Sequence, residues 1–245
     1  MPRAPSDTRT GRSLLAFGAH PDDIEFGCGG NVARETFRGR DAHFVVCSHG
    51  EAATHGTPET RAHEAARAAE RLGATLEFVT LDGDGKLEVR AVHALKLAGV
   101  IRRVRPGIVL APTLEERQHP DHFRLARLVA DAARLARYGG VDELHPLPAH
   151  PIDALLHYAI TADAEPAGAM PILVDISDAV VLAAWTDSMA AHGSQGATRP
   201  YAELQLARAR VWGLRAGVGH AQGLYPHDPL VLKSLDAVRR TARHF

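Results

Sequence analysis

The chain has 245 residues, of which 45% are hydrophobic and 23% charged, and its formal net charge is -1. This composition is that of an ordinary globular domain, and it lacks the basic excess of nucleic-acid-binding proteins, so we expect no nucleic-acid partner. No apolar run approaches the ~20 residues that span a bilayer, and the Arg/Pro/Thr-rich start lacks the apolar segment of a secretory signal. Two cysteines, Cys28 and Cys47, are too few for a disulfide framework and favour a reducing compartment. We therefore expect a cytoplasmic protein without a membrane span.

The first half of the chain alternates short apolar runs with amphipathic stretches. Predicted strands cover residues 13–17, 42–48, 76–81 and 108–111, and predicted helices cover 30–40, 58–72, 89–104 and 123–138. Strands and helices that alternate in this way predict βαβ units and a parallel sheet, and right-handed crossovers place helices on both faces. The expected fold class is therefore α/β, with a Rossmann-like, mostly parallel sheet.

The second half is less regular. Strands are expected at 155–160 and 172–176, a helix begins after Ser177 as its N-cap, and a long helix runs from Pro200 to near Gly217. There is no internal repeat or Pro/Ser-rich linker, so we expect one domain over residues 1–245, with 1–11 as a flexible leader. Glycines at 27, 29 and 30 do not have the spacing of a dinucleotide fingerprint, and the turn at 82–85 lacks the remaining ligands of a calcium loop.

A first polar cluster, Gly18-Ala-His-Pro-Asp-Asp23, directly follows the first predicted strand. Ligands of open parallel sheets bind at the carboxyl ends of strands, so His20, Asp22 and Asp23 lie where chemistry is expected. His and Asp both bind Zn²⁺, and a catalytic zinc takes three protein ligands and keeps one position open. Adjacent Asp residues point in different directions, so one can bind metal while the other faces the attacking water. Taken alone, this motif is equally compatible with a turn whose carboxylates cap the next helix.

A second cluster, Gln118-His-Pro-Asp-His122, follows the predicted strand at 108–111. His119 and His122 are three residues apart at the mouth of a helix, so one can bind metal while the other faces the substrate. Asp121 can hold a histidine ring in one tautomer, as carboxylates do around metal-binding imidazoles. A solvated polar loop is the alternative for this motif by itself. Two such clusters after strands of one sheet together predict a metal site.

These residues resemble the PIG-L/LmbE-like zinc-dependent N-acetylglucosaminyl deacetylases. The paired AHPDD and HPDH motifs carry the resemblance, and supporting segments lie at 48–51, 64–73, 174–177, 192–195 and 215–223. In overall pattern the chain is most similar to the deacetylases of bacillithiol biosynthesis, which act on N-acetylglucosaminyl malate. It departs from the family pattern at Ser48-His49, His55 and His220. These departures affect which substrate is expected, whereas the residues expected to carry out the reaction are all present.

The resemblance implies a metal-dependent N-deacetylase that hydrolyses the acetamido group of a small N-acetylglucosaminide. It implies that His20, Asp23 and His122 bind the metal, zinc or ferrous iron, and that Asp22 is the general base. His119 would stabilise the oxyanion while Asp121 holds the His119 ring. A homo-oligomer is expected by analogy with the bacillithiol-type relatives.

Residues that contact the substrate are predicted less directly. Glu51 and Asp84 follow the second and third strands, and either can accept hydrogen bonds from sugar hydroxyls. Arg61 can bind an anionic aglycone such as malate through a bidentate pair. Ordinary surface or loop roles remain open for all three, and Tyr201 and Arg208 are expected to be packing or surface residues. A small-amide zinc amidohydrolase and a catalytically silent metal-binding relative are the alternative functions.

Overall fold

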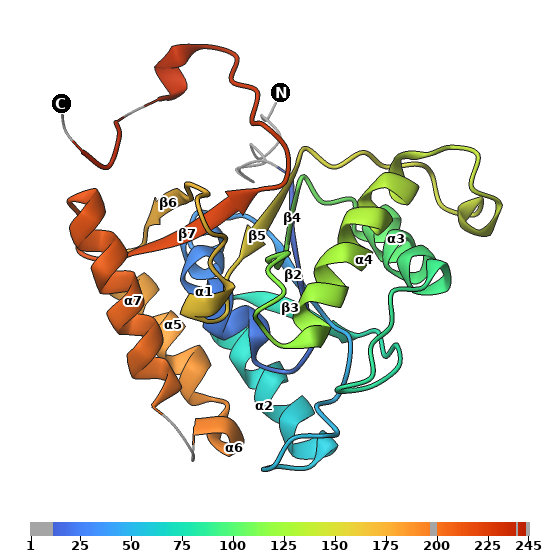
Figure 1. Cartoon of the computed structure of the whole chain (residues 1–245), viewed down its shortest axis with the longest axis horizontal. Coiled ribbons are helices and arrows are strands. Elements are labelled where there is room, and N and C mark those ends of the chain that lie inside the picture. The colour runs from blue at the N-terminus through green and yellow to red at the C-terminus, as the bar shows by residue number, and fades with distance from the viewer. Residues whose placement is uncertain (1–11, 197–199, 239, 244–245) are drawn as a thin grey trace, which may run out of the picture.

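The computed structural model describes residues 12–196, 200–238 and 240–243, so the predicted leader at 1–11 lies outside the described residues (Figure 1). Within the described chain, seven strands form one sheet in the order β3-β2-β1-β4-β5-β7-β6. The strands are β1 (Leu14–Gly18), β2 (Ala42–Val46), β3 (Ala74–Phe78), β4 (Ile108–Pro112), β5 (Ala154–Tyr158), β6 (Ile172–Asp175) and β7 (Ala221–Pro226). Strands β1 to β5 pair in parallel, and β7 is antiparallel to β5 and β6. This confirms the predicted single-domain, mostly parallel α/β fold.

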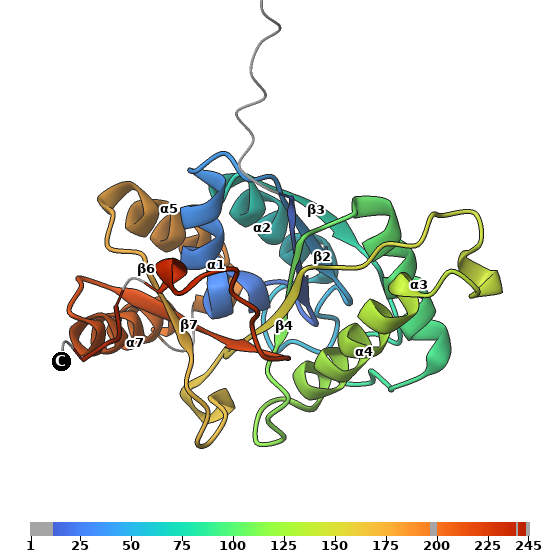
Figure 2. The same ribbon diagram turned by 90° about the horizontal axis from the view of Figure 1, so that it is seen from above.

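Helices cover both faces of the sheet, as Figures 1 and 2 show. One face carries α3 (Ala91–Val104) and α4 (Pro120–Arg137); the other carries α1 (Asp23–Thr36), α2 (Pro58–Arg71), α5 (Ala179–Ala190) and α7 (Tyr201–Ala216), with the short α6 (Gly193–Gly196) before α7. In β1, Leu14 and Ala16 belong to the core beneath α1 and α5, whereas Leu15 and Phe17 belong to the core beneath α3 and α4. Both faces of β1 are therefore buried, as is usual in parallel sheets. None of the described helices is long and apolar enough to cross a bilayer.

The first helix begins at Asp23, well before its predicted start at residue 30. Its glycines do not form a loop; they allow close packing. A Cβ on Gly27 would lie 2.2 Å from the Tyr158 ring, one on Gly29 2.7 Å from the Trp185 ring, and one on Gly30 2.8 Å from Gln222. The glycine cluster therefore lets α1 approach β5, α5 and β7, and this sets where the start of the helix meets the sheet.

Other element predictions also differ from the structure; α4, for example, begins at Pro120 rather than at residue 123. Strand β7 was not predicted, because residues 221–226 contain no continuous apolar run. Strand β3 begins at Ala74 rather than at residue 76. The N-cap of α5 is Asp178, whose carboxylate accepts the Val180 N–H, whereas Ser177 binds Asp175.

The glycine packing leads to a stability prediction. Gly27→Ala forces a methyl group into the Tyr158 ring, and overpacking of this kind costs about 1–3 kcal/mol. Gly99→Ala is the matched control, because Gly99 also lies inside a helix and its Cβ would meet Leu144 at an ordinary 3.8 Å. We expect Gly27→Ala to lower the free energy of unfolding in urea and Gly99→Ala to raise it by up to about 1 kcal/mol. Equal effects of the two variants would contradict this explanation of the glycine cluster.

Candidate active site

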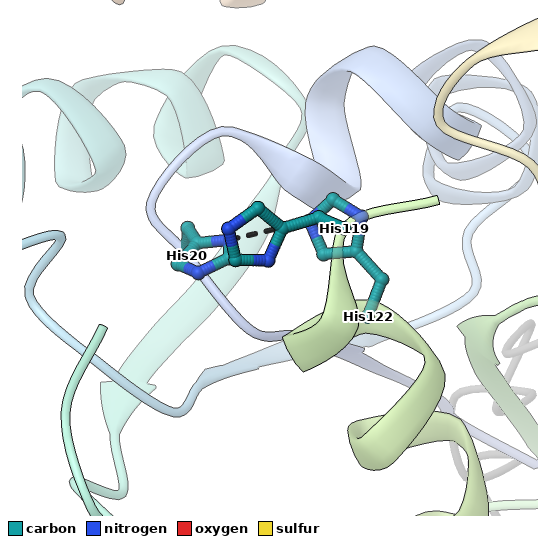
Figure 3. Close-up of side chains that lie close together, drawn as sticks. All are labelled: His20, His119 and His122. Carbon is teal, nitrogen blue, oxygen red and sulfur yellow. Dashed lines mark hydrogen bonds between the residues drawn. The ribbon is translucent and has the colours of Figure 1, made fainter. Parts of the chain in front are cut away.

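The two His-Pro-Asp motifs meet at the carboxyl ends of neighbouring strands. The first lies between β1 and α1, the second at the start of α4 after β4, and β1 pairs directly with β4. Figure 3 shows that His20, His119 and His122 point toward one another across this edge of the sheet. This is the edge at which ligands of open parallel sheets bind.

Donor atoms from three side chains of these motifs, His20, Asp23 and His122, lie close together and form what we call the donor triangle. His20 Nδ1 lies 3.2 Å from His122 Nε2, which lies 3.0 Å from Asp23 Oδ1. His20 Nδ1 is 3.6 Å from Asp23 Oδ2, and all three side chains are buried. A tetrahedral zinc with bonds of about 2.0–2.1 Å separates its ligand atoms by roughly 3.3 Å. The donor set and its spacing therefore fit a divalent metal of the zinc type.

Asp23 is oriented by the backbone of its own loop. Its Oδ2 accepts the N–H groups of Ala19 at 2.7 Å and His20 at 2.9 Å, which leaves Oδ1 toward His122. Burial alone would raise the pKa of Asp23, but the imidazoles of His122 and His20 hold this pKa well below its usual range. The carboxylate is thus held ionised, as a metal ligand must be.

The other nitrogen of His20 faces two carboxylates. His20 Nε2 lies 3.0 Å from Asp84 Oδ1 and 3.4 Å from Asp121 Oδ2. Asp121 Oδ2 also accepts the Gly85 N–H at 2.7 Å. Carboxylates in this position fix the tautomer of a metal-binding histidine and raise its basicity, so they direct His20 Nδ1 toward the donor triangle.

Asp121 was expected to hold the His119 ring, and the structure gives its carboxylate a different neighbour. His119 is the N-cap of α4, and its Nδ1 accepts the backbone N–H of Asp121 at 3.2 Å. The ring is therefore fixed by the backbone of residue 121, while the Asp121 side chain turns to His20. An Nδ1 that accepts leaves the proton on Nε2, so a neutral His119 can donate a hydrogen bond. Burial, with the positive charge of His20 and His122, lowers the pKa of His119 and favours this neutral form.

Asp22 has the most unusual backbone in the site. Its φ is 127°, a strained value for a residue with a side chain, and such residues concentrate at functional sites. Although it is the N-cap of α1, its side chain makes no capping hydrogen bond. Its carboxylate is bound by Arg61 at 3.2 Å instead. Burial, and then the charge of Asp23, raise the pKa of Asp22 to about 6, against the opposing charge of Arg61.

Two of the residues expected to contact substrate have other partners. Glu51 uses both oxygens on backbone N–H groups, those of His49 at 3.1 Å and Asp84 at 3.0 Å, and so ties two loops together. Arg61 is only 3% exposed, and it donates to the carbonyls of Pro21 and Gly50. Both side chains therefore have structural partners, and Arg61 also lines the cavity beside the site, so the roles of Glu51 and Arg61 in substrate binding stay predictions.

A cavity of about 410 Å³ opens onto the site. Asp22, Asp84 and His119 line it together with residues that were not predicted to belong to the site. These are the apolar or aromatic Phe26, Ile160, Tyr201 and Leu204 and the polar Thr54, Thr161, Gln195 and Gln205. Tyr201 packs against the core, as expected, and it also lines the cavity. Of these residues only Gln195 lies in a segment that the sequence analysis singled out, at 192–195. The start of α1, the loop after β2, the end of β5, α6 and α7 bring the set together from distant parts of the sequence.

Arg208 has a packing role, as expected. Its guanidinium binds the carbonyl of Ile160 at 3.0 Å and the carboxylate of Glu165 at 2.9 Å.

The fold and the site define an α/β protein with a candidate metal centre beside the carboxylate of Asp22, which lines the cavity and does not cap α1. A family model described as "GlcNAc-PI de-N-acetylase", the PIG-L family, matches residues 15–133. A conserved protein of Thermus thermophilus has a solved structure with a TM-score of 0.80 and 33% identity, over 91% of this chain and 97% of that one. The chain belongs to the PIG-L family.

Two curated relatives differ in activity. The diacetylchitobiose deacetylase of Thermococcus kodakarensis is 31% identical over 60% of each chain. The 4-oxalmesaconate hydratase of Pseudomonas putida is 30% identical over 53% of this chain and 54% of that protein. The chain thus matches no more than 60% of the length of these two relatives. Family membership and the deacetylase relative support the prediction of an N-deacetylase hydrolase.

The carboxylates around His20 lead to a prediction about metal affinity. Asp84→Ala removes a partner of His20 Nε2, and the loss of such a partner typically weakens metal binding about 10–100-fold. Asp82→Ala is the matched control, because Asp82 lies in the same loop and binds Arg90 and the Glu88 N–H instead of His20. Zinc titration of the metal-free proteins by calorimetry measures both. Equal affinities of Asp84→Ala and Asp82→Ala would show that Asp84 does not support the metal ligand.

Proposed function

We propose that the protein is a metal-dependent N-deacetylase that hydrolyses the 2-acetamido amide of an N-acetylglucosamine conjugate. The observation that carries this proposal is the donor triangle of His20, Asp23 and His122 with the carboxylate of Asp22 beside it. A metal-assisted amide hydrolysis needs a site for the cation, a base for water and a donor for the oxyanion. The family model and the diacetylchitobiose deacetylase support the choice of an acetamido sugar.

His20, Asp23 and His122 would hold the metal, zinc or ferrous iron. Zn²⁺ has no geometric preference of its own and accepts this nitrogen and oxygen donor set. A bound divalent metal lowers the pKa of water and polarises a carbonyl. Asp22 accepts the proton of the attacking water, because its carboxylate faces the cavity and is not spent on capping α1.

His119 is the proposed oxyanion donor. Its ring lines the cavity, and its Nδ1 is occupied by the Asp121 N–H, so Nε2 presents the proton. A preorganised donor of this kind is worth about 10²–10³ in kcat. Either Asp22, after it has taken up the proton, or His119 can then protonate the departing amine.

The proposed substrate is a small N-acetylglucosaminide, and N-acetylglucosaminyl malate of bacillithiol biosynthesis is the first conjugate to test. The cavity volume of about 410 Å³ suits a sugar with a small aglycone. The two free, buried cysteines support a reducing compartment, and we place the reaction in the cytoplasm. Homo-oligomer formation is proposed with it, by analogy with the bacillithiol-type relatives.

Amine release tests the proposed function. The zinc-loaded protein is incubated with N-acetylglucosaminyl malate, free N-acetylglucosamine and a UDP-linked analogue, and primary amine is measured. Preference for the malate conjugate would support the bacillithiol role, and release from another glycoside would keep the reaction and change the pathway. No release from any of the three, with zinc shown to be bound, would contradict the deacetylase proposal and favour another small amide or a silent site.

Two substitutions separate the base from the metal ligands. Asp22→Asn keeps the shape of the side chain and removes the base, so turnover should fall by at least about 10²-fold while zinc binding remains. His122→Ala removes one corner of the donor triangle, so zinc and turnover should be lost together. Metal analysis and amine release are measured on the same preparations. A His122→Ala protein with full zinc content would refute the ligand assignment.

A further inference from the structure

Arg61 joins two loops at the floor of the site. It lies in the first turns of α2, and its side chain is almost completely buried, at 3% exposure. Its Nη2 donates to the Pro21 carbonyl at 2.9 Å and to Asp22 Oδ2 at 3.2 Å, and its Nη1 donates to the Gly50 carbonyl at 3.2 Å. One guanidinium therefore links the loop after β1, which carries the base, to the loop after β2.

The backbone at Gly50 is shaped around this guanidinium. Gly50 has a φ of +71°, and a Cβ there would lie 1.8 Å from Arg61 Nη1. Only glycine leaves space for the planar group at this point, and only glycine adopts this φ without cost. Helix α2 therefore carries Arg61, and the loops after β1 and β2 provide the carbonyl groups and the space that its guanidinium needs.

The contact with Asp22 restrains a residue in a strained conformation. With a φ of 127°, Asp22 is held in an unfavourable region, and such strain persists only where surrounding contacts impose it. Arg61 binds both the carbonyl before Asp22 and the Asp22 carboxylate, so it fixes the peptide and the side chain together. A guanidinium fork is suited to this task, because its donors have a fixed planar geometry.

We propose that Arg61 is a positioning residue that holds the general base Asp22 in its strained turn, and that it does not bind an anionic group of the substrate. The proposal rests on the proposed deacetylase function. One oxygen of Asp22 is bound by Arg61, and the other is left for the attacking water. Asp23 is held by the Ala19 and His20 N–H groups, so this metal ligand has no direct contact with Arg61. Arg61 Nη1 also lies 4.0 Å from Asp84 Oδ2, the carboxylate that faces His20.

Steady-state kinetics of Arg61→Ala test this role. A displaced base should lower kcat by about 10²-fold, with KM nearly unchanged for both free N-acetylglucosamine and N-acetylglucosaminyl malate. Zinc should still bind, because His20, Asp23 and His122 all remain, and added guanidinium ion should restore part of kcat. A rise in KM confined to the malate conjugate, with kcat retained, would overturn the proposal and assign Arg61 to the anion.

Gly50→Ala provides a second test that keeps the arginine. The added methyl group displaces the guanidinium, so kcat should fall in the same way as in Arg61→Ala. Gly168→Ala is the control for backbone strain, because Gly168 also has a positive φ, +78°, and its Cβ would meet no atom within 4 Å. Full kcat in Gly50→Ala with a folded protein would count against the proposal.

Hydrogen exchange provides a readout that does not need turnover. In Arg61→Ala, backbone amides at residues 19–23 should exchange faster than in the wild type, while those of α3 keep their protection. Unchanged exchange at 19–23 would overturn the positioning role even if no substrate is found. Amine release by the wild type decides the proposed function separately, so failure of one idea is distinguishable from failure of the other.

Discussion

The close approach of two buried imidazoles and one buried carboxylate, with donor atoms 3.0–3.6 Å apart, is the interaction on which the site depends. Buried polar groups of this kind are costly unless each has a partner. Here two of the three members, Asp23 and His20, have partners on the side away from the donor triangle. Backbone N–H groups bind the far oxygen of Asp23, and Asp84 and Asp121 face the far nitrogen of His20. The donor atoms that remain point at one another, which is the arrangement that a divalent cation satisfies.

The rest of the fold holds the loops that carry these side chains in place. The parallel pairing of β1 with β4 brings the two His-Pro-Asp motifs together, and the glycines of α1 let that helix lie against β5, α5 and β7. Asp22 can then stand at the start of α1 without capping it. Metal ligands and base come from adjacent residues of one turn, but different contacts hold them, so substitutions can separate metal binding from turnover.

The sequence predicted the alternation of strands and helices and the two motifs at strand ends, because both depend on local periodicity. It did not predict β7, whose pairing depends on β5 and β6, or the start of α1, where glycine allows close packing. Spacing also could not decide which way a loop side chain turns. Asp121 was expected beside His119 and lies beside His20, and the contact of Arg61 with Asp22 was not predicted. These contacts join residues far apart in sequence.

The most direct test of the central claim is an anomalous difference map from crystals of the full chain grown with zinc. Our account predicts one peak about 2.0–2.2 Å from His20 Nδ1, Asp23 Oδ1 and His122 Nε2. The described residues also contain two other clusters of potential ligand atoms, one formed by His20, His119 and His122 and one by His20, Asp84 and Asp121. A peak bound by His119, or a peak on the Nε2 side of His20 with Asp84 and Asp121 as ligands, would contradict the account.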